Sequence, residues 1–141
     1  MIKVVVIRIA QVYHIGTLII VRTKMNKQVD ITAESDMAEG TMKAVSIERQ
    51  EVLLARTQDD FYAVSNICPH MKGKLSEGTL DGNIVTCPRH GWQFDVRTGE
   101  NVRWLKGSGV TSGMAKLVKP PRPIKSYDIE VKDGRIVIEI Q

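Results

Sequence analysis

Apolar and polar residues alternate, or apolar residues form short runs between polar turns, along most of the chain. Asp81-Gly82 and Asp133-Gly134 are hairpin signals, because Gly accepts the positive φ that tight turns require. The pattern is strand-like nearly throughout and predicts an all-β fold, a small antiparallel sandwich or barrel. The expected strands span residues 29–33, 42–47, 52–56, 61–65, 127–131 and 135–140.

Two segments fit this plan less well. Residues 1–24 fit an extra strand pair, an appended arm, or an extension ahead of an alternative start at Met25. Residues 105–119 contain three glycines and no clear period, and a proline-rich run follows them. We therefore expect an N-terminal extension or extra strands at 1–24 and one domain at 25–141, with an inserted loop at about 105–119.

The composition is that of an ordinary globular chain. With 141 residues and 43% hydrophobic content, one domain can bury its own core. No segment approaches the roughly 18–20 uninterrupted apolar residues of a membrane span, and Arg8 interrupts the only stretch that resembles a signal peptide. Two cysteines agree with a reducing compartment, so we expect a cytoplasmic location and no membrane partner.

The net charge of +4 is unevenly distributed along the chain. Residues 1–27 carry five basic groups and no acidic one, and residues 97–125 carry seven basic groups and one acidic. Between them, residues 28–96 carry six basic and eleven acidic groups. The chain has no recognition-helix pattern and no array of stacking aromatics, which disfavours nucleic acid as a partner. A solvated surface, or a docking patch for an acidic redox partner, explains the basic segments better.

The chemistry is concentrated in two short motifs, C-P-H and C-P-R-H. They hold both cysteines, Cys68 and Cys87, and two of the three histidines, His70 and His90. The residues alone leave three alternatives: a disulfide, a four-coordinate zinc site, or a 2Fe–2S cluster. A disulfide leaves the paired histidines unexplained. Zinc has the correct ligand count, but zinc modules usually place each ligand pair in a small knuckle or helix.

The surroundings of these motifs resemble the Rieske-type 2Fe–2S ferredoxins. The resemblance covers FYAVSNICPHMKGKLSEGTLDGNIVTCPRHGWQFDVRTGE (residues 61–100) and PRPIKSYDIEVKDGRIVIEI (residues 121–140), and more loosely residues 25–56. It implies a Rieske domain at 25–141 with a cluster-binding subdomain at about 66–104 and one 2Fe–2S cluster per chain.

The resemblance also implies the ligands and the function. Cys68 and Cys87 would bind the inner iron, and His70 and His90 the outer one. The chain would be a soluble one-electron carrier that passes electrons from a reductase to a terminal oxygenase or reductase, without catalytic residues of its own. Two alternatives stay open: a small cluster-bearing subunit of a larger oxidoreductase, such as a nitrite-reductase-like complex, and a zinc-stabilised binding module without a redox role.

The neighbours of the second motif predict the reduction potential. High-potential members of the family resemble one another in having a Ser after the His-Gly pair and a Tyr two residues on, whose hydroxyls stabilise the reduced cluster. Here those positions hold Trp92 and Phe94, which offer no hydroxyl. We predict a midpoint potential near the low end of the Rieske range of about −150 to +300 mV. Potentiometric titration measures it, and a value above about +150 mV would contradict the prediction.

Overall fold

The computed structural model describes residues 4–15, 18–58, 60–103 and 122–141; of residues 4–15 and 18–25 it describes the backbone alone. The expected inserted loop at 105–119 lies outside the described residues. The chain divides into two compact units, one made of Met1–Asp36 with Tyr127–Gln141 and the other of Met37–Ser126. No helix in the described part of the chain is long and apolar enough to cross a membrane.

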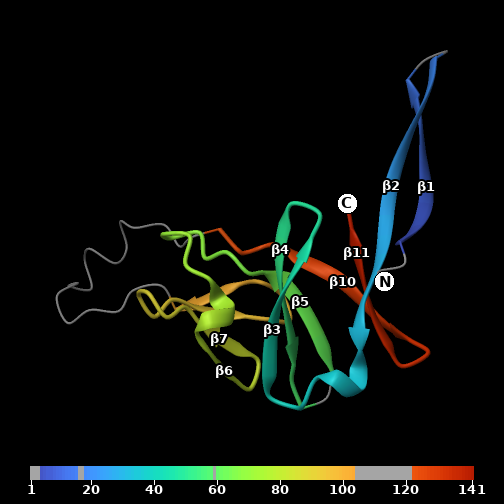
Figure 1. Ribbon diagram of the computed structural model, residues 1–141. Helices are drawn as coiled ribbons and strands as arrows, with labels where there is room; N and C mark the ends of the chain where they lie inside the picture. Colours follow the sequence, from blue (N-terminus) through green and yellow to red (C-terminus); the bar gives the residue numbers. More distant parts are fainter. Residues whose placement is uncertain (1–3, 16–17, 59, 104–121) are drawn as a thin grey trace, which may run out of the picture. The chain divides into compact units, whose positions relative to one another are not determined.

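The first unit is built on an antiparallel sheet (Figure 1). Its strands, in the order in which they pair, are β1 (Val4–Ile15), β2 (Leu18–Ala33), β11 (Arg135–Ile140) and β10 (Ser126–Lys132). The predicted hairpin at Asp133-Gly134 is confirmed, and both residues have positive φ, 50° and 71°. Strand β2 continues without a break through residue 25, so no change of secondary structure marks the expected boundary there, and the division stays a prediction.

The second unit contains two antiparallel sheets. Three strands form one of them: β3 (Thr41–Ile47), β4 (Gln50–Arg56) and β5 (Phe61–Ser65). Four short strands form the other: β6 (Thr79–Asp81), β7 (Ile84–Thr86), β8 (Gln93–Asp95) and β9 (Asn101–Arg103). The helical segments of the described residues are two 3-10 turns, η1 (Glu34–Asp36) and η2 (Leu75–Glu77), so the all-β prediction is confirmed.

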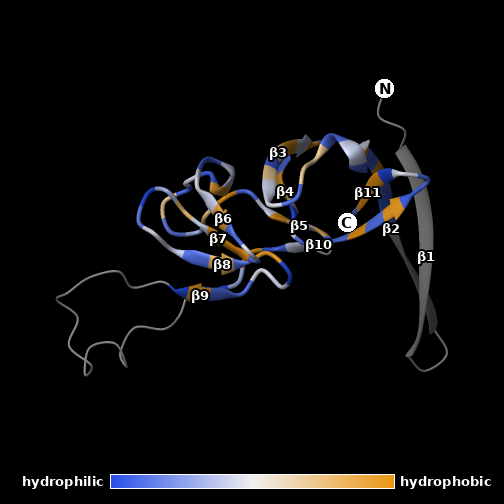
Figure 2. Cartoon of the chain, turned by 90° about the horizontal axis from the view of Figure 1, so that it is seen from below, coloured by the Kyte–Doolittle hydropathy of each residue, from blue (hydrophilic) through white to orange (hydrophobic). Residues whose placement is uncertain are grey.

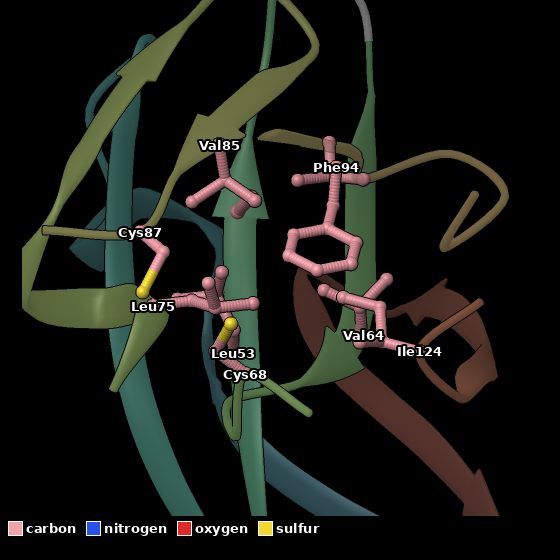
Figure 3. Packing of buried hydrophobic residues seen from close by; sticks show 10 residues of the cluster. Leu53, Val64, Cys68, Leu75, Val85, Cys87, Phe94 and Ile124 are labelled. Carbon is pink, nitrogen blue, oxygen red and sulfur yellow. The ribbon is translucent and has the colours of Figure 1, made fainter. Parts of the chain in front are cut away.

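A buried cluster joins the elements of the second unit. Figure 2 shows hydrophobic residues grouped in the strands, with mostly hydrophilic turns between them. Strand β4 is buried on both faces, since Val52–Ala55 are all 0% exposed, which explains its continuous apolar run. Its Leu53 belongs to one buried cluster with residues of β5, β7 and β8 and with both cysteines (Figure 3). The cysteine loops therefore rest directly on the core.

Asp95 closes the connection between β8 and β9. Its Oδ1 accepts the backbone N–H of Arg97 at 2.9 Å, and its two oxygens accept the guanidinium N–H groups of the same residue. Its carbonyl accepts the N–H of Gly99 at 2.7 Å. The hydrogen bonds and charge of Arg97 hold the pKa of the Asp95 carboxyl below its usual value, although burial opposes them. The ionised carboxylate thus stabilises the fold.

We predict that Asp95→Asn lowers the free energy of unfolding by about 1–3 kcal/mol at pH 7, because charged hydrogen bonds are lost. The pKa of Asp95 is lower in the folded chain than in the unfolded one. Its contribution is therefore complete above the unfolded pKa of about 3.9 and is lost as pH falls through the folded pKa. Urea unfolding should show a smaller difference between Asp95→Asn and the parent at about pH 3 than at pH 7, and an equal difference would contradict the prediction. Glu100→Gln, at an exposed carboxylate, is the control.

Candidate metal centre

Asn66 holds both ends of the first cysteine loop. It is fully buried at the end of β5, where its backbone N–H donates to the carbonyl of Glu51 at 3.0 Å. Its own carbonyl accepts the N–H of Leu75, and its Oδ1 accepts the N–H of Ser76, both at 2.8 Å. Sequence reasoning missed this residue. The sequence offered one signal for it: an amide residue stands between the expected strand at 61–65 and Cys68.

The two cysteine loops are closed in the same way. In each, the cysteine N–H donates to the carbonyl five residues on, and the N–H four residues on donates to the cysteine carbonyl. These bonds join Cys68 to Gly73 (2.8 Å) and to Lys72 (3.0 Å), and Cys87 to Trp92 (2.7 Å) and to Gly91 (3.0 Å). The residue four positions on has positive φ in both loops, 52° at Lys72 and 71° at Gly91. Each cysteine thus begins a turn of the same kind.

The structure brings the four predicted ligands together as two pairs. Cys68 and Cys87 are free thiols, 1% and 2% exposed, and both lie beside Leu75 in the buried cluster (Figure 3). His70 and His90 are exposed at the loop tips, with ring centroids 4.6 Å apart and ring planes at 81°. The sulfur pair therefore faces the core and the imidazole pair faces solvent. Their role as ligands stays a prediction.

The environment of Cys68 disfavours an isolated thiolate. Burial, with a smaller contribution from the neighbouring Cys87 sulfur, raises the pKa of the Cys68 thiol to about 11. The backbone N–H groups of His70 and Met71 donate to the sulfur and oppose this rise. Without a cation beside it, Cys68 is therefore protonated at neutral pH. The same N–H groups would stabilise a thiolate bound to a metal.

The donor set fits a 2Fe–2S cluster chemically. Two soft sulfur donors and two neutral nitrogen donors stand as separate pairs, and such a cluster takes one pair of ligands on each iron. Within the described ranges, no three or more His, Cys, Asp or Glu side chains are gathered as ligands of a single metal ion. The residues present thus match a centre with a buried, sulfur-bound side and an accessible, nitrogen-bound side.

Trp92 links the second loop to the first. Its ring stacks on the ring of His70, with centroids 4.3 Å apart and planes at 15°. It is half-buried and packs against the buried cluster, whereas Phe94 is fully buried inside it. Phe94 is thus an ordinary core residue, and Trp92 is a contact between loops. The sequence did not predict this contact of Trp92, because it joins residues from different loops.

A groove of about 580 Å³ lies beside the second loop. Its walls come from the end of η2 and from the turn between β7 and β8, and the lining residues are Glu77, Gly78, Thr79, Thr86, Cys87, Pro88, Arg89, His90 and Gly91. Gly78 makes the close approach of these walls possible, since a Cβ there would stand 1.8 Å from the carbonyl oxygen of Thr86. A side chain at position 78 would therefore push the two loops apart.

Comparison with known families gives one match over most of the chain. The model of the Rieske [2Fe-2S] domain matches residues 27–127. The ferredoxin component of the naphthalene 1,2-dioxygenase system of Pseudomonas putida is 29% identical, over 81% of this chain and 96% of the relative. The ferredoxin CarAc of Metapseudomonas resinovorans is 33% identical, over 77% of this chain and 89% of the relative.

Solved structures agree with these relatives. The ferredoxin of carbazole 1,9a-dioxygenase from Nocardioides aromaticivorans IC177 superposes with a TM-score of 0.65 at 26% identity, over 79% of this chain and 95% of that one. A chain in the complex of reduced oxygenase and oxidised ferredoxin of carbazole 1,9a-dioxygenase gives a TM-score of 0.63 at 32% identity, over 79% of this chain and 91% of that one.

We predict that Trp92 sets the orientation of the His70 ring. In the reduced, cluster-loaded chain, Trp92→Ala should change the nitrogen hyperfine coupling of one histidine and leave the other unchanged. Trp92→Phe should keep both, because a phenyl ring can also stack on the imidazole. Pulsed EPR measures the two couplings separately. Identical couplings in the parent and in Trp92→Ala would contradict the prediction. Trp92→Ala should also lower the free energy of unfolding by about 2–4 kcal/mol.

Proposed function

This chain belongs to the Rieske [2Fe-2S] domain family, and we infer that it is a one-electron carrier of the ferredoxin type and not itself an enzyme. The relatives support this, since both the naphthalene dioxygenase component and CarAc are named as ferredoxins. The match spans 96% of the naphthalene dioxygenase ferredoxin, so this chain corresponds to nearly the whole of that separate component. A carrier therefore explains the relatives better than a subunit of a larger oxidoreductase or a zinc-stabilised module.

The proposal assigns one 2Fe–2S cluster per chain to the two loops. Cys68 and Cys87 hold the inner iron, and His70 and His90 hold the outer iron. The observation that carries this assignment is the division of the donors: the sulfurs are 1% and 2% exposed, while both imidazoles are exposed. When bound, the cluster supplies a one-electron redox centre that two neutral imidazoles make easier to reduce than one with four thiolates.

The residues of this chain act on that centre in three ways. The core beneath the cysteines excludes water from the sulfur side. The N–H groups of His70 and Met71, which donate to the Cys68 sulfur, stabilise added negative charge. Trp92 and Phe94 add no hydroxyl donor, which supports a potential near the low end of the family range. The exposed imidazoles leave one side open, so electrons enter and leave there.

The proposed partners are a reductase that supplies the electron and a terminal oxygenase that receives it. Support comes from the relatives, which are named as components of dioxygenase systems, and from the oxygenase–ferredoxin complex of carbazole 1,9a-dioxygenase. A cytoplasmic location belongs to the same proposal, because cysteines that bind iron must stay reduced. We also keep residues 25–141 as the Rieske domain, with residues 66–104 as its cluster-binding part and residues 105–119 as an insertion.

Spectroscopy and iron analysis of the purified chain test the proposal. We expect red-brown protein, visible absorption of a 2Fe–2S cluster, and an anisotropic EPR signal after reduction. Cys87→Ser and His90→Ala should each lower the bound iron at least about tenfold, whereas His14→Ala, at the third histidine, should keep it. Colourless protein with bound zinc would refute the proposal, and so would full iron content in both ligand variants.

A further inference from the structure

The tips of the two loops form one exposed surface, which we call the loop-tip rim: residues 69–72 and 88–90. Every residue of the rim is exposed. Met71 is 54% exposed and gives the rim one large apolar side chain. The rim surrounds the two imidazoles that the proposed function makes the path of the electron. Any protein that exchanges electrons through them must cover it.

Arg89 is held against the first loop by its aliphatic stem. Its Cγ and Cδ lie 3.2 Å from the point where a Cβ on Gly73 would stand, so the absence of a side chain at Gly73 makes room for the stem. The charged end of a long side chain held in this way stays in water. The guanidinium group therefore belongs to the rim, although the stem packs across the gap between the loops.

Lys72 places a second positive charge on the rim. Its left-handed backbone, with φ of 52°, follows from the hydrogen bond of its N–H to the Cys68 carbonyl. Neither Lys72 nor Arg89 forms an ion pair with a residue that the structure describes, whereas the nearby Lys74 is paired with Glu51 at 3.3 Å. The rim thus carries two uncompensated cations inside a segment, residues 28–96, in which acidic residues outnumber basic ones eleven to six.

We propose that the loop-tip rim is the docking surface for a redox partner protein whose own docking face is acidic, with carboxylates opposite Lys72 and Arg89 and an apolar contact for Met71. This inference rests on the proposed function and adds the charge of the partner to it. Complementary charge raises the rate of encounter and selects the orientation, and an exposed Met adapts to an apolar surface. The contact is charge-steered, so its rate falls as salt screens the charges.

Electron transfer to two haem proteins of opposite charge tests the proposal. The reduced, cluster-loaded chain is mixed in a stopped-flow instrument with cytochrome b5, which is acidic around its haem edge, or with cytochrome c, which is basic. With cytochrome b5 we expect a rate that falls as ionic strength rises, and with cytochrome c a rate that rises. The double variant Lys72→Gln/Arg89→Gln should lower the low-salt rate with cytochrome b5 about tenfold and raise that with cytochrome c.

The control separates the rim from the total charge. Lys43→Glu, at an exposed position of β3, changes the net charge by the same two units and should leave both rates within about twofold of the parent. Equal effects of the control and the double variant would overturn the proposal, as would a rate with cytochrome b5 that does not fall with salt. Absorption and EPR spectra distinguish the two failures. A parent chain without a cluster refutes the proposed function and this inference with it. Intact clusters in the parent and in the double variant, with rates that the double variant does not change, refute the docking surface alone.

Discussion

The backbone hydrogen bonds that close the two cysteine loops are the constraint on which the rest of the site depends. Each cysteine uses both its N–H and its carbonyl to close its own turn, so its side chain leaves the backbone in a defined direction. Asn66 then ties the first loop to β4 and η2, and the pairing of β7 with β8 ties the second. Because these bonds are internal to the protein, the loops are shaped by the chain itself.

The site balances two opposed demands on the cysteine sulfurs. Burial protects them from water and raises the pKa of Cys68, which disfavours the thiolate that a metal needs. Hydrogen bonds from the backbone N–H groups of His70 and Met71 to the Cys68 sulfur partly stabilise its thiolate form. A bound cation would supply the remainder, so burial makes the sulfur pair selective for a positively charged centre. The exposed histidines would escape this cost, because they would bind as neutral ligands.

Side-chain contacts between the loops take the place of a covalent link. This chain has two cysteines, and both are free thiols, so no disulfide joins the loops. Here Trp92 stacks on His70, Arg89 lies along Gly73, and the absence of a side chain at Gly78 lets the chain approach Thr86. Each contact is weaker than a disulfide. Together with the shared core, they hold the two pairs of donors at one end of the unit.

The sequence alone determined the features that depend on neighbouring residues. Alternation predicted the strands and Asp133-Gly134 predicted a hairpin. The motifs C-P-H and C-P-R-H marked two cysteine–histidine loops, whose role as ligands stays a prediction. The Asp81-Gly82 signal was also correct for β6 and β7, although the turn itself comprises Gly82 and Asn83. Each of these patterns is local, because φ preferences and the two-residue period of a strand act over a few residues.

Only the tertiary structure decided what depends on residues far apart in the chain. The pairing of β2 with β11 joins the two ends of the sequence. The role of Asn66 required Glu51 of β4 and the residues of η2 to meet at one buried residue. The contact of Trp92 with His70 required both loops to be in place. The separation of buried sulfurs from exposed imidazoles has the same origin. It is set by which side of each loop faces the core, and the core is assembled from strands that no local pattern brings together.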